Sequence, residues 1–434
     1  MGRIFTGEKA WLIDFFATFA ALGLTMMKKI ILLTLWASLL WPAQMTAQTA
    51  VQDEAPQADS TVLMVPLRQL VTERLDALVD DSLMERSQLG LMVWDLTDDT
   101  LLYARGEHQL LRPASTMKVL TAIAALDCLG PDYRYTTTLY HKGTISQGRL
   151  QGDLVCVGGM DPMFDRKDMQ AFAQALKKKG VKSLGCRLII DTSMKDGDKW
   201  GEGWCWDDKN PTLSPLLYEG KTDFAGQLLR ELRSAGIGTG SVSAIIGNCP
   251  KDAQPLCTRS HTIDEVLKQM MKESDNLYAE ATYYQIAARV GRRPATAKDA
   301  QKVEHELLTK VGLDADHYRL ADGSGLSLYN YLTAEAQVML LRYAWQQPDI
   351  YSHLLASLPI AGVDGTLEKR LVDTAAQGNV RAKTGTVSGI SALAGYCTAP
   401  NGHRLCFSII NQGVRRSAEG REFQNRVCLA LCQP

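Results

Sequence analysis

The sequence around Ser115 constrains the fold more than any other stretch of the chain. An apolar run from Val119 to Leu126 follows Ser115-Thr116-Met117-Lys118, and Gly130 comes soon after it. This pattern predicts a buried helix from Ser115 to Leu129 that begins at a capping residue and ends before a glycine. Lys118 then lies one turn after Ser115, on the same face of the helix.

A serine and a lysine one turn apart can act as a nucleophile and its base. The serine hydroxyl attacks poorly until a base takes its proton. A lysine can do so when partial burial lowers its pKa toward neutrality. The N-terminus of the helix also offers N–H groups and a positive dipole end to a developing oxyanion. On its own the pattern is weak, because a serine before a helix is an ordinary N-cap.

A second polar motif, Ser274-Asp275-Asn276, interrupts two helical stretches, Ile263 to Lys272 and Leu277 to Val290. Its ordinary interpretation is a turn that separates two helices. Its functional interpretation gives Ser274 a role in proton relay and Asn276 an amide that binds the substrate backbone.

A third motif, Lys383-Thr384-Gly385-Thr386, lies in a predicted strand. Gly385 lacks a side chain where a substrate strand would approach closely. Lys383 and the hydroxyls of Thr384 and Thr386 can bind a terminal carboxylate. The alternative is an ordinary set of strand residues with a lysine at the edge.

Together the three motifs are far more specific than any one of them. They follow the order S-x-x-K, S-D-N and K-T-G, which is the signature of class A β-lactamases and penicillin-binding proteins. From about Leu89 to Val414 the chain resembles the D-Ala-D-Ala carboxypeptidase/endopeptidase family of the penicillin-binding protein 4 type. Three glycine-rich stretches also match this family, although each alone is only a turn. They are Gly158–Pro162, Ala321–Ser327 and Gly362–Leu367.

The resemblance implies a serine carboxypeptidase/endopeptidase that acts on peptidoglycan stem peptides through an acyl-enzyme and is inhibited by β-lactams. It implies that Ser115 is the nucleophile, that Lys118 is its base, and that the backbone N–H groups of Ser115 and Thr386 form the oxyanion hole. The other implied roles concern the leaving group and the substrate: Ser274 passes a proton to the leaving amine, Asn276 binds the substrate carbonyl, and Lys383, Thr384 and Thr386 hold the terminal carboxylate.

One further stretch and one departure concern the middle of the chain. The stretch from Gly203 to Asp208 resembles a family segment whose aspartate helps to bind the diamino acid of the stem peptide, and Asp208 is the better match. A surface acidic pair is the alternative. The distance along the chain from Ser115 to Ser274 is shorter than is usual in the family. We therefore expect the smallest nested domain of the family to be missing or reduced after Tyr218.

The order of strand and helix patterns predicts an α+β fold. We expect a β-lactamase/transpeptidase-like domain at 66–132 and 259–434, in which helices pack on an antiparallel sheet. Between these two stretches the pattern changes to short strands and helices, which predicts an inserted smaller α/β domain at 133–258. Thr262 and Glu265 predict a capping box at the start of the next helix.

A hairpin is expected near the C-terminus, where strands at Val380–Cys397 and His403–Ile410 join through Pro400-Asn401-Gly402. A two-residue turn at Asn401-Gly402 predicts that Cys397 faces Cys406 in a non-hydrogen-bonded pair. Such a pair is close enough for a disulfide. Two small core residues side by side are the alternative.

The N-terminal residues 1–47 contain a secretory signal pattern. Lys28-Lys29 precedes an apolar stretch from Ile30 to Trp41, and a small-residue cleavage site ends at Ala47. We expect the true start at Met26 or Met27, a flexible linker at 48–65, and a periplasmic protein. A membrane anchor is the alternative, but each apolar stretch is short for a span. Peripheral membrane association is a further possibility.

Composition excludes several classes of function. Lys+Arg numbers 47 and Asp+Glu 48, so the net charge of -1 favours no nucleic acid partner. The ten cysteines lack zinc spacing, and we expect neither a metal nor another cofactor. Peptidoglycan peptides are the expected partners.

Three rival functions are disfavoured by the sequence. A β-lactamase or esterase of the same fold is disfavoured because no class A deacylation glutamate can be identified. A non-catalytic wall-binding or penicillin-sensing protein has little reason to retain both Ser115 and Lys118. An α/β-hydrolase is disfavoured because the sequence has no G-x-S-x-G.

Overall fold

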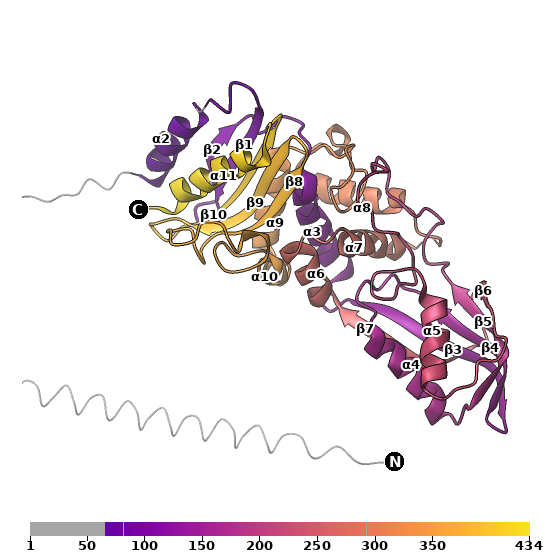
Figure 1. Cartoon of the computed structure of the whole chain (residues 1–434). Helices are drawn as coiled ribbons and strands as arrows, with labels where there is room; N and C mark the ends of the chain where they lie inside the picture. Colours follow the sequence, from indigo (N-terminus) through magenta and orange to yellow (C-terminus); the bar gives the residue numbers. More distant parts are fainter. Residues whose placement is uncertain (1–65, 81, 292) are drawn as a thin grey trace, which may run out of the picture. The chain divides into compact units, whose positions relative to one another are not determined.

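The computed structural model describes residues 66–434 except 81 and 292. The expected signal region at 1–47 and the whole of the expected linker at 48–65 lie outside the described residues. The described chain holds two five-stranded sheets (Figure 1). None of its helices is long and apolar enough to cross a membrane.

The first sheet is antiparallel, with the strand order β2-β1-β10-β9-β8. It brings a hairpin from the start of the described chain against three strands from its end. Its strands are β1 (Gln88–Asp95), β2 (Thr100–Arg105), β8 (Arg381–Val387), β9 (Ile390–Thr398) and β10 (Arg404–Gln412).

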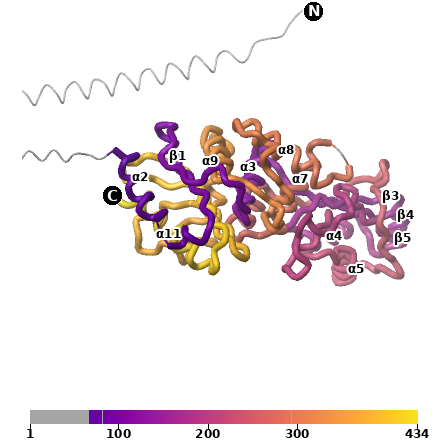
Figure 2. Tube along the Cα trace, turned by 90° about the horizontal axis from the view of Figure 1, so that it is seen from above, coloured from indigo at the N-terminus to yellow at the C-terminus, as the bar shows by residue number. Residues whose placement is uncertain are grey.

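Helices cover both faces of this sheet, because its strands alternate side chains between two apolar cores. One face packs against α2 (Leu67–Val79) and α11 (Ser417–Cys432), which lie side by side (Figure 2). The other face packs against a helical region. Its helices are α3 (Met117–Leu129), α6 (Ile263–Lys272), α7 (Asn276–Arg289), α8 (Ala297–Lys310), α9 (Ala334–Gln346) and α10 (Pro348–Ser357), with short 3-10 turns η1 (Ala114–Thr116), η2 (Ala315–His317) and η3 (Gly365–Leu367).

The second sheet is mixed, with the order β6-β5-β4-β3-β7. Strands β4, β5 and β6 run parallel, and β3 pairs antiparallel with β4 and β7. Helices α4 (Arg166–Lys178) and α5 (Phe224–Ser234) bury their apolar faces against it. The strands are β3 (Arg134–Ser146), β4 (Arg149–Val157), β5 (Ser183–Asp191), β6 (Ala244–Ile246) and β7 (Gln254–Thr262). β7 continues past the expected limit of the inserted domain at 258, and the domain limits stay a prediction.

This arrangement confirms the expected α+β fold, in which helices pack on an antiparallel sheet. The capping box at the start of α6 is also confirmed: the Thr262 side chain accepts from the Glu265 N–H, and the Glu265 side chain accepts from the Thr262 N–H. The expected strand from Val380 to Cys397 is wrong in one respect. It consists of two strands, β8 and β9, because a tight turn with Gly389 at φ 76° reverses the chain between them.

The predicted pairing of Cys397 with Cys406 is wrong. In the ladder Cys397 faces Leu405, and Cys406 faces Tyr396. The loop has three residues rather than two, since the Ala399 N–H donates to the His403 carbonyl at 2.9 Å and Gly402 takes φ 87°. One extra residue moves a side chain to the other face of the sheet. Cys397 therefore lies in the core beneath α11, where it contacts Cys432, and Cys406 lies in the core beneath α9.

Candidate active site

Ser115 lies in the 3-10 turn η1, directly before α3. The Thr116 hydroxyl and N–H both donate to the Pro113 carbonyl, at 2.7 and 3.2 Å, and these bonds hold the turn. Ala114 takes φ 46°, which is unusual for a residue with a side chain and marks a constrained backbone. Ser115 itself is half-buried. The turn thus presents its hydroxyl at the start of a helix, as the sequence predicts.

Lys118 is fully buried one turn later. Its Nζ lies 3.1 Å from Ser115 Oγ, and it donates to Asn276 Oδ1 at 2.8 Å and to the Ser324 carbonyl at 2.7 Å. Burial lowers the pKa of Lys118 to about 8, although the negative charges of Asp322, Glu280 and Asp275 oppose the shift. A lysine of this pKa can take a proton from a hydroxyl at the distance observed.

The turn Ser274-Asp275-Asn276 connects α6 to α7, where the sequence predicts an interruption between helices. Asp275 caps α7, since its carboxylate accepts from the Leu277 and Tyr278 N–H groups at 2.9 and 3.3 Å. Ser274 takes φ 61°, so the chain reverses sharply here. The turn therefore sends Asn276 toward Lys118 and Ser274 toward Lys383.

Lys383 lies on β8 and is fully buried. Its Nζ donates to Ser274 Oγ at 2.8 Å and to the Thr384 carbonyl at 2.7 Å. Burial, with a smaller contribution from the positive charge of Lys118, holds the pKa of Lys383 well below its usual range. The structure thus joins the three sequence motifs through contacts between their side chains.

The rest of the third motif faces a neighbouring loop and the turn at Ser115. Thr384 Oγ1 donates to Thr366 Oγ1 at 2.8 Å, and Thr386 is exposed. A Cβ on Gly385 would lie 2.7 Å from the Pro113 carbonyl oxygen. The close approach that requires this glycine is therefore made by the backbone before Ser115, whereas sequence reasoning assigned it to the substrate.

Sequence analysis missed three groups that contact the site. The Ser324 carbonyl accepts from Lys118, and Glu280 accepts from the Ser324 N–H at 2.9 Å. Thr366 contacts Thr384. Ser324 and Thr366 belong to two of the glycine-rich stretches that match the family, although each stretch alone predicts only a turn. Glu280 gave no such signal, because it lies inside a helix.

Asp208 is exposed and lies in a turn, in which its own N–H donates to the Cys205 carbonyl at 3.2 Å. Nearer the catalytic groups, Trp204 of the same stretch donates from Nε1 to Asp322 Oδ2 at 2.7 Å. The stretch is therefore connected to the loop that contacts Lys118, and Asp208 itself faces solvent.

Two other features could suggest a site elsewhere. Asp95, Asp98 and His403 could approach a metal ion, but Asp95 already accepts from the Thr97 and Asp98 N–H groups and pairs with His403 at 2.7 Å. This group includes none of the three motifs, and we assign it no role.

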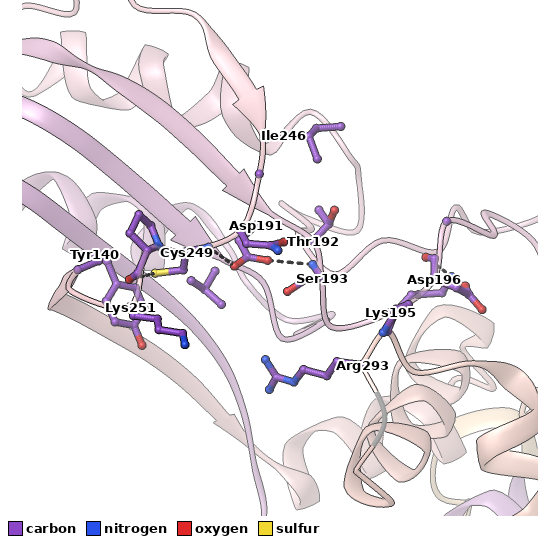
Figure 3. Close-up of a pocket in the computed structure, with 17 residues that line it drawn as sticks. Tyr140, Asp191, Thr192, Ser193, Lys195, Asp196, Ile246, Cys249, Lys251 and Arg293 are labelled. Carbon is purple, nitrogen blue, oxygen red and sulfur yellow. Dashed lines mark hydrogen bonds and ion pairs between the residues drawn. The ribbon is translucent and has the colours of Figure 1, made fainter.

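A cavity of about 850 Å³ lies beyond the ends of β5 and β6 (Figure 3). Its wall contains two buried charged side chains, and both already have hydrogen-bond partners. Asp191 accepts from the Ser193 and Cys249 N–H groups at 2.9 and 2.6 Å, and Lys195 donates to Asp196 at 2.6 Å. None of its lining residues belongs to the three motifs. We therefore place the candidate active site at the motifs and not in this cavity.

Comparison with known proteins places this arrangement in a family. The profile of the D-Ala-D-Ala carboxypeptidase 3 (S13) family matches residues 71–217 and 215–431. The two matched stretches meet near Tyr218, where the sequence predicts a missing or reduced domain. Carboxypeptidase DacB of Mycolicibacterium smegmatis is 30% identical over 439 residues, which cover 92% of this chain and 94% of that protein. D-alanyl-D-alanine carboxypeptidase DacB of Haemophilus influenzae is 26% identical over 410 residues, covering 75% and 85%.

Solved structures show the same fold. The crystal structure of penicillin binding protein 4 (dacB) from Haemophilus influenzae has the same fold, with a TM-score of 0.74 and 24% identity over 84% of this chain and 98% of that chain. A second crystal structure of that protein, in complex with a β-lactam, gives a TM-score of 0.68 and 25% identity over the same shares.

Proposed function

Because the chain belongs to the D-Ala-D-Ala carboxypeptidase 3 (S13) family, we propose that it removes the terminal D-alanine of peptidoglycan stem peptides through an acyl-enzyme on Ser115. The enzyme class, a serine-type D-Ala-D-Ala carboxypeptidase, follows from this membership. The observation that carries the assignment of residues is the contact of Lys118 Nζ with Ser115 Oγ at 3.1 Å, inside a buried site.

In the first step Ser115 Oγ attacks the carbonyl carbon of the penultimate D-alanine, and neutral Lys118 takes the hydroxyl proton. The N–H groups of Ser115 and Thr386 stabilise the oxyanion. When the C–N bond breaks, the proton that Lys118 took passes by way of Ser274 to the leaving amine, and Lys118 returns to its neutral form; Ser274 contacts Lys383 at 2.8 Å. D-alanine leaves, and water then attacks the ester, releases the shortened peptide and restores the Ser115 hydroxyl.

The substrate is bound along β8. This strand is the last in its sheet, and an edge strand can pair with an extended peptide. Asn276 binds the backbone of the substrate, and Lys383, Thr384 and Thr386 hold its terminal carboxylate. Gly385 allows β8 to lie against the turn that carries Ser115, because a side chain at this position would strike the Pro113 carbonyl.

Asp208 contacts the free end of the diamino acid in the stem peptide. Its exposure supports this role, since an exposed carboxylate is available to a cationic ligand. Attack on a D-alanyl-diaminopimelate cross-link by the same chemistry makes the enzyme an endopeptidase as well. The signal pattern before Ala47 supports action in the periplasm, where β-lactams acylate Ser115 as substrate mimics.

Defined muropeptides test this function. The protein should release D-alanine from pentapeptide muropeptides, and Ser115→Ala should abolish release. Ser352→Ala is the matched control, because Ser352 is exposed on α10 and donates only to the Asp349 carbonyl. Release that survives in Ser115→Ala would contradict the assignment, and cleavage of cross-linked dimers measures the endopeptidase activity separately.

A further inference from the structure

Residues 202–204, which precede the turn at Asp208, contact the loop that contains Asp322 and Ser324 and that lies next to Lys118. Trp204 Nε1 donates to Asp322 Oδ2 at 2.7 Å, and Glu202 pairs with Arg319 at 3.0 Å. Gly203 takes φ 73°, and a Cβ there would lie 2.6 Å from the Tyr329 ring. Polar and steric contacts therefore hold residues 202–204 on this loop. The turn 205–208 follows directly, and its residues 206–208 are exposed.

Asp322 is the centre of this loop and is buried. Its two carboxylate oxygens accept five hydrogen bonds, four of them at 2.7 Å and one at 3.3 Å. A buried carboxylate with this many donors holds its neighbours in one arrangement. The donors are Trp204 Nε1, Ser324 Oγ, the Gly325 and Ser327 N–H groups, and Asn330 Nδ2.

The same loop contacts the catalytic lysine. The Ser324 carbonyl accepts from Lys118 Nζ at 2.7 Å, and the next residue, Gly325, is held by Asp322. Gly325 takes φ 77°, and a Cβ there would lie 1.9 Å from the Ala114 carbonyl oxygen. The loop is therefore packed against the turn that carries Ser115. A displacement of Asp322 moves the carbonyl that orients Lys118.

Asp322 also acts on Lys118 through its charge. Its carboxylate raises the pKa of Lys118 and so opposes the effect of burial. The same side chain thus orients the amine through Ser324 and adjusts its affinity for the proton.

We propose that Asp322 is a positioning residue that connects the Trp204–Asp208 segment to the base Lys118, so that a substrate bound to this segment is acylated faster. The inference rests on the proposed function, because it takes Lys118 as the base and Asp208 as a substrate contact. It adds a specificity role for Trp204, whose indole N–H is the single side-chain hydrogen bond described between the segment and Asp322. A substrate that engages Asp208 restrains the segment, and Trp204 transmits that restraint to Asp322.

The direct test is Trp204→Phe, which keeps an aromatic ring and removes the N–H donor. Two peptides that end in D-Ala-D-Ala are compared, one with diaminopimelate before them and one with alanine. We expect kcat/KM for the diaminopimelate peptide to fall about tenfold, the loss typical of a hydrogen bond to a charged group. The alanine peptide should change much less, because four donors still hold Asp322.

Trp94→Phe is the matched control. Trp94 Nε1 also donates to an aspartate, Asp99, at 2.9 Å, but at the turn between β1 and β2. This variant should leave both peptides unchanged. If Trp204→Phe behaves like Trp94→Phe on both peptides, the proposal is overturned.

A double-mutant cycle examines the connection itself. Asp208→Ala should lower kcat/KM for the diaminopimelate peptide in the wild-type background and have a smaller effect in Trp204→Phe, since the two residues act in one path. Losses that simply multiply would show independent contacts and overturn the proposal.

Asp322→Asn examines the positioning role through the pH profile. Removing the negative charge lowers the pKa of Lys118, so the acid limb of kcat/KM should move to lower pH while its plateau falls. A plateau that falls with no movement of the limb would show a structural loss alone and count against the role. If the variant does not fold, Trp204→Phe and the cycle still decide. Failure of the proposed function is a separate result, because the wild-type protein would then form no acyl-enzyme with penicillin.

Discussion

Buried charged side chains at the candidate active site and around the second sheet have different kinds of partner. Around the first sheet, Lys118 and Lys383 are fully buried, and neither makes a salt bridge with any described residue. Around the second sheet, four buried charges have charged partners within 3 Å. These pairs are Asp153–Arg187, Asp161–His261, Asp168–Arg259 and Lys195–Asp196.

This difference in partners distinguishes residues that take part in the reaction from residues that stabilise the fold. A buried charge that has a charged partner is compensated by it. Removal of one partner leaves the other charge uncompensated, so the substitution lowers stability. A buried lysine that has only hydroxyl, amide and carbonyl partners has a lowered pKa and can exchange a proton near neutral pH. Substitutions of the two buried lysines should therefore change the reaction, and substitutions of the paired charges around the second sheet should change folding.

The largest effect is expected for Lys118→Ala. Acylation by penicillin should slow by roughly 10²–10⁴-fold, since the variant lacks the general base. Stopped-flow or gel-based labelling measures the rate, and thermal unfolding checks that the variant is folded. A rate within a few-fold of wild type would remove Lys118 from the mechanism.

The counterpart in the second region is Lys195→Met. Lys195 is buried and pairs with Asp196 at 2.6 Å, so its loss should lower the free energy of unfolding by about 3 kcal/mol, within the range for broken buried pairs. Urea unfolding measures this loss. Penicillin acylation of the folded variant should match wild type, and a large loss of acylation without destabilisation would break the comparison.

Some of this contrast is visible in the sequence and some is not. The three motifs predict which side chains meet, because each has a local signature on a helix, a turn or a strand. The partners that tune them, Glu280 and the Ser324 carbonyl, come from a helix interior and a glycine-rich turn that have no such signature. The pairing register of β9 and β10 was also not predicted correctly, because one extra residue in the loop at Gly402 decides on which face of the sheet Cys397 lies.

The pH profile of acylation gives a smaller but sharper test. Lys118 acts as a base only when neutral, and its pKa is about 8. About one molecule in ten has the neutral amine at pH 7 and about nine in ten at pH 9, so the rate should rise roughly ninefold between them. A flat profile would show that another group limits proton transfer.

The smallest effect is expected for His261→Gln in the second region. Asp161 raises the pKa of His261 above its usual value, and burial raises the pKa of Asp161 despite that partner. Both groups bind protons more tightly in the folded state than in the unfolded state. The stability that this pair contributes is therefore fully present at low pH and is lost as pH rises through the folded pKa values. The variant should flatten this decline above pH 6.5, as measured by urea unfolding at several pH values. An unchanged pH dependence would show that the pair is not the cause.

The central claim is that Ser115 is the residue that becomes acylated. The most direct measurement is mass spectrometry of peptides from protein incubated with penicillin. We expect an adduct on the peptide that contains Ser115, with fragment ions that locate it at this residue, and no adduct in Ser115→Ala. An adduct at another serine, or undiminished labelling of Ser115→Ala, would contradict it.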